Sequence, residues 1–359
     1  MAKKVKSAMA DAYTFTVGDY KVNTVVEELL LLGLSHQSEE SAHQRTEWAY
    51  KNNPAGPAIV CIMRHKESHK DVGLVTLCKR QVWSRNGLAE TGIFCDLVID
   101  ISHRTLGPAL KLMERALIGA DEAKLDRTSG WPSERSKALF SRLPQSQVGK
   151  IDVYRRYFDW SDEFYSRLPK PLACFVGYIA GLVDSCIYGV KKLIRSKLFT
   201  IQHLDEFTPA FDELWSVARA RYDEIGVRDA TFLTWRFTDN PEQCHKIFAM
   251  YSKSGNRLAG YVVYREHKEG TIEISDFLAS HSDFSERNLL DSFCTNWRDR
   301  GHKKISLLYS GNPNTVRNLW WCGFIHVGSR VCNFRQPDGS KLPMGTAVTH
   351  VTQADQDVG

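Results

Sequence analysis

The segment that decides the fold, residues 96–117, reads DLVIDISHRTLGPALKLMERAL. Its beginning completes a short apolar run, residues 94–101, whose β-branched side chains predict a buried strand. Its end, residues 108–117, is amphipathic with proline in the first turn, which predicts a helix. A strand that leads through a tight turn into a helix is therefore the unit around which we interpret the rest of the chain.

The turn between strand and helix contains Arg104, Gly107 and Ala109. The first N–H groups of a helix have no partner within the helix, and the helix dipole is positive at that end, so such a turn binds anions. Glycine at position 107 lets a ligand approach the backbone, and the small Ala109 leaves the start of the helix uncrowded. We therefore expect this turn to hold a pyrophosphate.

The composition indicates a soluble globular protein with two or three domains. The chain has 359 residues, of which 43% are hydrophobic and 25% charged, which is ordinary for this class. The net charge of +5 is modest for this length, and no stripe of basic and aromatic residues is present. These features argue against nucleic acid as a partner, including an aminoacyl-tRNA.

The nine cysteines are odd in number and form no CxxC or CxxH pair. This pattern argues against a disulfide framework and against a zinc site, so we expect no metal. The first residues, MAKKVKSAMADAY, lack the apolar stretch of a secretory signal. We expect a reducing, cytoplasmic location.

The second half of the sequence repeats the first. The matched pairs are Trp48 with Trp235, Pro54 with Pro241, Val72-Gly73 with Ala259-Gly260, and Gly130-Trp131-Pro132 with Gly311-Asn312-Pro313. The first three pairs share an offset of 187 residues and the last an offset of 181, the drift that altered loop lengths produce. We interpret the repeat as a duplicated domain, with copies at residues 13–160 and 204–336.

Hydrophobic periodicity predicts similar elements in both copies. The first has helices at residues 24–34, 41–50 and 135–142 and strands at 13–20, 58–63, 72–78, 90–101 and 148–157. The second has helices at residues 208–222 and 285–300 and strands at 246–251, 258–264, 271–278 and 304–309. The fold class is thus α/β, with a mixed, mostly antiparallel sheet flanked by helices.

The second copy lacks the features of the anion-binding turn. At the corresponding position it reads Ser282-Asp283-Phe284-Ser285-Glu286-Arg287. This segment has no glycine, and its two acids would repel a phosphate. We expect one anion site per chain, in the first copy.

Residues 161–203 form an apolar helical insert between the copies. Residues 172–190 are apolar apart from Asp184, and four basic residues follow by position 197. Two alternatives remain: a helix buried between the halves, or peripheral contact of residues 172–197 with the inner face of a membrane. A full span is disfavoured because it would place the two copies on opposite sides of the membrane. Residues 337–359 are polar, and we expect a flexible tail.

The first copy resembles the GNAT acyltransferase superfamily. The motif Arg104-Thr105-Leu106-Gly107-Pro108-Ala109 is similar to that superfamily's Arg/Gln-x-x-Gly-x-Gly/Ala acyl-CoA motif. The segment from Asn312-Pro313 to Gly323-Phe324 looks like its late Asn…Gly-Phe segment, and the two Trp…Asn-Pro pieces look like those of tandem-domain members. The resemblance implies two tandem GNAT-like domains.

The resemblance also implies acyl-CoA as co-substrate. The backbone of the strand end would face the pantetheine and thioester, and the turn would bind the pyrophosphate. The residues concerned are Ile99, Asp100, Ile101, Arg104, Thr105, Leu106, Gly107, Pro108 and Ala109.

Direct attack of an amine on the thioester requires a general base. The candidates are Asp96, His103 and, with no special claim, Glu90. On the equivalent strand of the second copy, Asp276 and Glu273 are candidates for binding the acceptor. The tyrosine that often protonates the leaving thiolate in this superfamily has no counterpart, since Phe140 occupies the corresponding helix of the first copy.

Two functional hypotheses follow. The first is an acyl-CoA-dependent N-acyltransferase that acylates a small polar amine, such as a nucleotide-linked amino sugar of polysaccharide biosynthesis. The second is a catalytically silent GNAT-like module that binds acyl-CoA and associates with a membrane through the insert.

Overall fold

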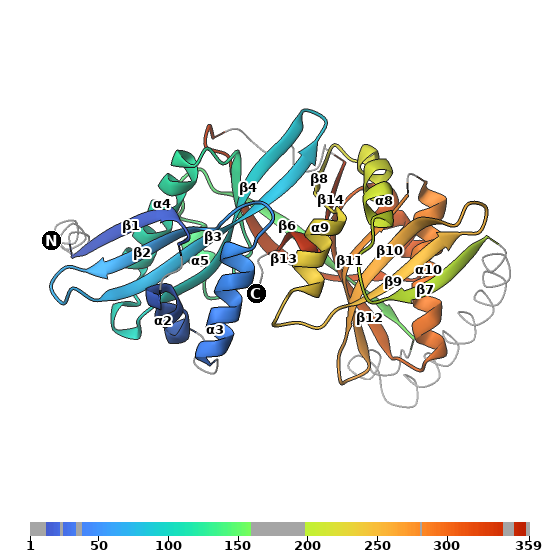
Figure 1. Ribbon diagram of the computed structural model, residues 1–359, viewed down its shortest axis with the longest axis horizontal. Helices are drawn as coiled ribbons and strands as arrows, with labels where there is room; N and C mark the ends of the chain where they lie inside the picture. Colours follow the sequence, from blue (N-terminus) through green and yellow to red (C-terminus); the bar gives the residue numbers. More distant parts are fainter. Residues whose placement is uncertain are drawn as a thin grey trace.

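One hydrogen-bonded sheet runs through both halves of the chain in the computed structural model, which describes residues 12–21, 24–33, 38–158, 198–280, 282–339 and 348–356. Within these residues the sheet has 14 strands. The order along its main path is β1-β2-β3-β4-β5-β13-β6-β12-β11-β10-β9-β7. Figure 1 shows β1 to β4 on one side of the molecule, β9 to β12 on the other, and β6 and β13 between them.

In the first half, β1 to β4 form an antiparallel meander, β5 pairs parallel with β4, and helices cover both faces. Its strands are β1 (Tyr13–Asp19), β2 (Ile59–His65), β3 (Asp71–Ser84), β4 (Gly87–Ile99), β5 (Arg127–Gly130) and β6 (Gln147–Tyr157). Its helices are α2 (Thr24–Gly33), α3 (Glu39–Arg45), the π-helical turn η1 (Thr46–Lys51), the 3-10 turn η2 (Ile101–His103), α4 (Leu106–Glu122) and α5 (Lys137–Phe140). Alternation along β3 places Leu74 and Cys78 in the core under α2, and Val75 and Leu77 in the core under α4.

The second half repeats this arrangement. Its strands are β7 (Phe199–Leu204), β8 (Glu224–Gly226), β9 (Lys246–Ser252), β10 (Arg257–Glu266), β11 (Thr271–Ala279), β12 (Lys304–Gly311), β13 (Ile325–Arg335) and β14 (Thr349–Val351). Its helical segments are α8 (Ala210–Ala218), η3 (Arg219–Arg221), α9 (Ala230–Leu233), the π-helical turn η4 (Thr234–Thr238), α10 (Asp283–Asp299), α11 (Pro313–Trp321) and η5 (Gln353–Asp355). The expected α/β class with a mixed, mostly antiparallel sheet is confirmed.

The last long strand of each half pairs across the junction. β6 lies between β12 and β13, and β13 in turn pairs with β5, so each strand borders strands of the other half. Figure 1 shows β6 and β13 at the centre of the molecule. The two copies are therefore joined by main-chain hydrogen bonds as well as by side-chain packing.

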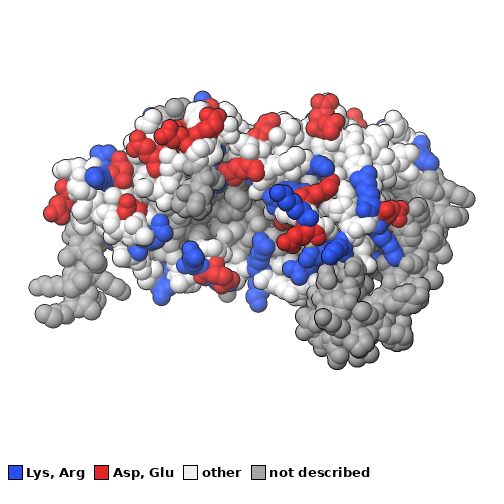
Figure 2. All heavy atoms as spheres, turned by 90° about the horizontal axis from the view of Figure 1, so that it is seen from below, with Lys and Arg blue, Asp and Glu red and all other residues white. Residues whose placement is uncertain are grey.

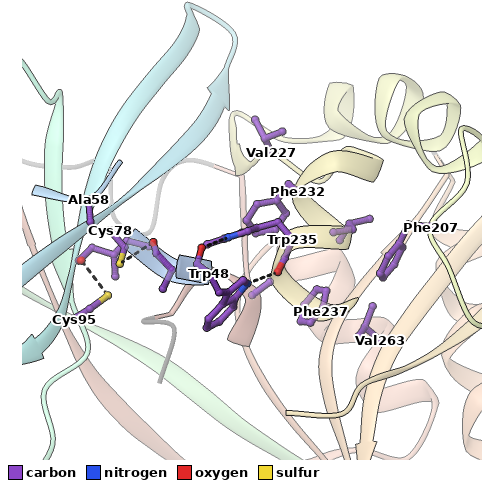
Figure 3. Packing of buried hydrophobic residues seen from close by; sticks show 14 of the residues in the cluster. Trp48, Ala58, Cys78, Cys95, Phe207, Val227, Phe232, Trp235, Phe237 and Val263 are labelled. Atoms are coloured by element: carbon purple, nitrogen blue, oxygen red, sulfur yellow. Dashed lines mark hydrogen bonds between the residues drawn. The ribbon is translucent and has the colours of Figure 1, made fainter. Parts of the chain in front are cut away.

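Two equivalent tryptophans mark the relation between the copies. The indole N–H of Trp48 donates to the carbonyl of Trp235 at 2.6 Å, and that of Trp235 donates to the carbonyl of Trp48 at 2.9 Å. The two rings are stacked with centroids 5.5 Å apart, as Figure 3 shows. Both residues lie in π-helical turns, η1 and η4. This reciprocal contact joins residues 187 positions apart, the offset at which the sequence predicts equivalent positions in two copies.

The C-terminal segment closes a ring of strands at the junction. β14 pairs with β12 and with β8, and β8 pairs with β3. Together with the neighbours already given, these pairings form a closed circuit β3-β4-β5-β13-β6-β12-β14-β8. A Cβ at Gly311 would lie 2.1 Å from the carbonyl oxygen of Thr349, so glycine is required where β14 approaches β12.

The expected flexible tail covered residues 337–359, and these contacts correct that expectation for residues 348–356. Residues 348–356 carry a strand, a 3-10 turn and the buried side chains of His350, Thr352 and Ala354. The sequence signal was weak because β14 has only three residues and its partners are polar as well as apolar. Most of the insert, including residues 172–190, lies outside the described residues. Among the described residues, no helix is long and apolar enough to cross a membrane.

Candidate functional site

Strands β4 and β5 separate at their ends and leave an opening in the sheet. Their parallel pairing covers only Thr91 to Ile93 on β4 and Arg127 to Ser129 on β5. Beyond this point β4 continues to Ile99, whereas the chain after β5 turns away through residues 131–136. A cavity of about 630 Å³ fills the opening and is lined by both segments and by the start of α4.

The N-terminus of α4 borders this cavity without a capping side chain. The N-cap residue Thr105 makes no side-chain cap hydrogen bond, and the first turn contains no acid. The amides of Leu106 and Gly107 lie in this turn, where a helix provides no partner for them. Nothing lies within 4 Å of a Cβ added at Gly107. The helix start is thus open to an anion.

Two arginines add positive charge to the cavity lining. Arg104 lines the cavity, and its Nε and Nη2 donate to the carbonyl of Ile99 at 3.0 and 2.8 Å. Arg135 is exposed, also lines the cavity, and forms no ion pair with any residue that the structure describes. Since Arg45 pairs with Asp96, the one carboxylate among the described lining residues, the cavity favours an anionic ligand.

Asp96 lies at a β-bulge in β4. The register shifts between Leu74 and Thr76 of β3, and Asp96 has a φ of 39°. Its carboxylate accepts two hydrogen bonds from Arg45, at 2.8 and 3.0 Å, and one from the Tyr50 hydroxyl at 2.5 Å. Arg45 also pairs with Glu242 of the second half. Asp96 therefore belongs to a buried ion network, and both of its oxygens are already acceptors.

The other site residues predicted at the end of β4 differ in burial and in whether they reach the cavity. Ile99 is buried and lines the cavity, whereas Ile101 is 83% exposed. Asp100 caps η2 by accepting from the Ser102 amide and hydroxyl, which lowers the pKa of its carboxyl. His103 does not line the cavity, and its Nδ1 lies 2.9 Å from the Tyr13 hydroxyl.

The structure corrects the expectation that Asp276 and Glu273 face a bound acceptor. Asp276 is fully buried and accepts from Arg228, Tyr261 and Thr352. Glu273 pairs with Arg265 at 2.7 Å and does not line this cavity. Sequence alternation predicts which strand residues are buried only where the strand register is regular. The register of β10 against β11 shifts between Val263 and Tyr264, opposite these residues.

The corresponding opening of the second half is filled by the chain itself. β11 pairs with β12 only from Thr271 to Ile274, so these strands also separate. The imidazole of His350 occupies the space beyond, 2.9 Å from the carbonyl of Phe277 through Nε2, with ring centroids 5.0–5.2 Å from Tyr222, Phe277 and Tyr309. Burial, assisted by Arg228, lowers the pKa of His350 to about 3, so the ring is neutral.

The helix that follows this second opening is capped, unlike α4. The Ser282 hydroxyl accepts from the Ser285 amide, and Asp283 and Glu286 lie in the first turn of α10. Glu286 is fully buried and paired with Arg221. The acids identified in the sequence thus stand where a phosphate would otherwise bind.

Sequence reasoning missed three residues of the first cavity. Trp131 and Arg135 line it without having been proposed as site residues, and Phe140, named above only in place of a tyrosine, lines it as well. Phe140 packs edge-on against Phe94 with centroids 5.4 Å apart, and no tyrosine is found among the described lining residues. No group of three or more His, Cys, Asp or Glu residues that could hold a metal occurs in the described ranges.

The charges on the face shown in Figure 2 are mixed. Lys and Arg side chains alternate there with Asp and Glu side chains, and no continuous stripe of one sign crosses the face.

The fold is that of the GCN5-related N-acetyltransferases. A probable N-acyltransferase, a conserved protein of unknown function from Enterococcus faecalis, is similar with a TM-score of 0.60 and 12% identity over 90% of this chain and 72% of that one. A GCN5-related N-acetyltransferase from Anabaena variabilis gives the same TM-score and identity, over 90% and 73%.

N-myristoyltransferase from Saccharomyces cerevisiae, solved with bound myristoyl-CoA, is similar with a TM-score of 0.50 and 11% identity, over 94% of this chain and 88% of that one. No protein-family model matches the sequence, and a search of curated proteins finds no match. At these identities the comparisons establish the fold, and they confirm the resemblance that the motif of the first copy suggested.

Proposed function

We propose that this protein is an acyl-CoA-dependent N-acyltransferase with one acyl-CoA site per chain, in the opening between β4 and β5. One observation carries the proposal: the first opening contains a cavity of about 630 Å³ beside an uncapped helix start, whereas His350 and the C-terminal segment fill the second. The likeness to proteins named as N-acyltransferases supports it. The resemblance of Arg104–Ala109 to the acyl-CoA motif agrees with both.

In this proposal the cavity lining and the Gly107 amide beside it bind different parts of the ligand. The amides of Leu106 and Gly107 and the charges of Arg104 and Arg135 would hold the pyrophosphate. The unpaired edge of β4 beyond Ile93 would take the pantetheine as an added strand, since its main-chain groups have no β5 partner there.

The reaction would transfer the acyl group directly to an amine. The amine nitrogen attacks the thioester carbon, a C–N bond forms, the C–S bond breaks, and the proton lost by nitrogen ends on the CoA thiol. Positioning of the two substrates supplies most of the acceleration. The acceptor class proposed here is a small polar amine, for example a nucleotide-linked amino sugar of polysaccharide biosynthesis.

The geometry argues against both Asp96 and His103 as the general base. The Asp96 carboxylate is held in place by Arg45 and Tyr50, so we assign it to positioning β4 at the bulge. His103 lies outside the cavity lining. Water within the cavity is the base that this arrangement favours.

The lack of an unpaired carboxylate among the described cavity-lining residues supports a second candidate, a module that binds acyl-CoA without turnover. Asp96 is the one carboxylate among the described cavity-lining residues, and it is paired. A thiol-release assay with acetyl-CoA and longer acyl-CoAs across an amine panel separates the two. An acylated amine, identified by mass, supports the enzyme; acyl-CoA binding without any thiol release supports the silent module.

The variant Gly107→Trp tests the site itself. A Cβ at this position meets nothing within 4 Å, so the fold should be retained while the side chain blocks the helix start. Phe284→Trp is the matched control, because Phe284 occupies the same second position of α10 and is 54% exposed. Loss of acyl-CoA binding in Gly107→Trp alone supports the proposal; equal behaviour of the two variants would refute it.

A further inference from the structure

The ring of eight strands at the junction encloses a second cavity. Its volume is about 440 Å³, and every one of the eight strands contributes lining residues. An eight-stranded closed arrangement is either filled by side chains or wide enough for one small ligand. Here the interior is not filled, and its size is in the range of small-molecule sites.

Five buried polar atoms of the lining residues have no hydrogen-bond partner among the described residues. They are Nε of Arg80, Oγ1 of Thr91, Nε of Arg127, Nε1 of Trp131 and Nδ1 of His350. These atoms are themselves buried in the cavity wall. Native structures pair most buried polar groups, so several unpaired ones around one cavity point to a ligand or water that reaches them. Four of the five atoms carry hydrogens and can donate, which favours a ligand rich in acceptors.

The cavity also has an excess of positive charge. Arg127 forms a two-point ion pair with Glu224, at 2.8 and 3.0 Å, and Arg80 pairs with Asp355 at 3.3 Å. Lys150, from β6, is exposed and forms no ion pair with the described residues. Three cations therefore face two carboxylates, and the cation without a countercharge is the accessible one.

Trp131 connects this cavity to the acyl-CoA cavity, because it lines both. A ligand inside the ring would thus lie next to the region where the proposed thioester is attacked. The ring interior is otherwise lined by aliphatic and aromatic side chains such as Val82, Ile93, Ile225 and Phe334. Its ligand should combine a compact, partly apolar body with acceptor groups.

We infer that the ring interior binds the acyl acceptor and that this acceptor is an amine carrying an anionic group, held by Lys150 and the unpaired donors. This inference rests on the proposed function and narrows its acceptor from small polar amines to anionic ones. A carboxylate and a phosphate share the required chemistry. The C-terminal segment takes part, because β14 forms one wall of the ring.

The test is binding of matched amines to the full chain saturated with CoA, measured by calorimetry at millimolar concentration. One pair is glucosamine 6-phosphate with glucosamine, and the other is phenylalanine with phenylalaninamide. We expect the anionic member of at least one pair to bind more tightly, and the pair that responds identifies phosphate or carboxylate. Lys150→Gln should weaken that binding about tenfold, the scale of one charge-assisted hydrogen bond, and leave the affinity for CoA unchanged.

Lys66→Gln is the control, since Lys66 is exposed in the turn between β2 and β3 and lines neither cavity. Thr91→Val adds a second readout, because it removes one unpaired donor while conserving volume. Preference for the neutral amines, no binding of either anionic amine, or equal binding to Lys150→Gln and the wild type would overturn the inference. Failure to bind CoA in the same preparation would instead overturn the proposed function.

Discussion

His350→Gln should make the protein less sensitive to mild acid. The wild-type imidazole is 1% exposed, is neutral, and contacts the Phe277 carbonyl through Nε2 at 2.9 Å. The charges that act on it are those of Arg228, Asp355 and Arg221, of which the two arginines lower its pKa. Glutamine preserves a side-chain N–H donor for Phe277 and cannot titrate, so the variant isolates the effect of protonation.

The direction of the pH effect on stability follows from the lowered pKa of His350. The folded pKa is about 3, against 6.5 for an unperturbed histidine, so the unfolded chain binds a proton at mildly acidic pH and the folded chain does not. The stability from this neutral ring is complete above the unfolded value and is lost as the pH falls toward the folded value. Between about pH 7.5 and about pH 5.5 the loss is about 1.4 kcal/mol.

Urea unfolding of the wild type and His350→Gln at both pH values measures this directly. The difference in unfolding free energy between the two proteins should shrink by about 1.4 kcal/mol at the lower pH. His43→Gln is the control, because His43 is exposed and its pKa is raised by the hydrogen bond that its ring donates to Glu27; it should not reproduce the effect. An unchanged difference at the two pH values would refute the burial of a neutral imidazole in the second opening.

Five further substitutions test other parts of the structure by urea unfolding. Trp48→Phe and Trp235→Phe each remove one of two reciprocal hydrogen bonds and should cost about 1 kcal/mol apiece; clearly unequal costs would argue against equivalent positions. Arg45→Leu leaves Asp96 without its ion-pair partner and should cost about 3–5 kcal/mol, whereas a cost near zero would show that the network is not buried. Gly130→Ala places a Cβ 2.1 Å from the Phe140 ring and should cost about 1–3 kcal/mol, while Gly107→Ala should change stability by less than about 0.5 kcal/mol; similar costs would contradict the open helix start.

The elements that the sequence predicted well have a strong hydrophobic period and end at glycine or proline. The strand and helix around Arg104–Ala109, and the duplicated tryptophans, combine apolar periods with glycine and proline stops that act locally. β4 ends at Ile99 and α4 begins at Leu106, within a few residues of the expected boundaries. Local chemistry determines these features, so one sequence suffices to find them.

The features that the sequence did not reveal depend on partners far along the chain. The apolar alternation of β6 and β13 indicates strands but not that each crosses to the other half. Asp96 looked like a base because its partner, Arg45, lies 51 residues away on another element. β14 is too short to carry a period, and its place is set by β12 and β8. The second cavity exists only because these pairings close a ring.

The stoichiometry of acyl-CoA binding tests the central claim most directly. Calorimetric titration of the full chain with acetyl-CoA and with myristoyl-CoA should give one site per chain for at least one of them, and Gly107→Trp should abolish it. This result is expected because the start of α4 is open while His350 and the acids of α10 close the second opening. Two sites per chain, binding that survives Gly107→Trp, or no binding of either acyl-CoA would contradict the account.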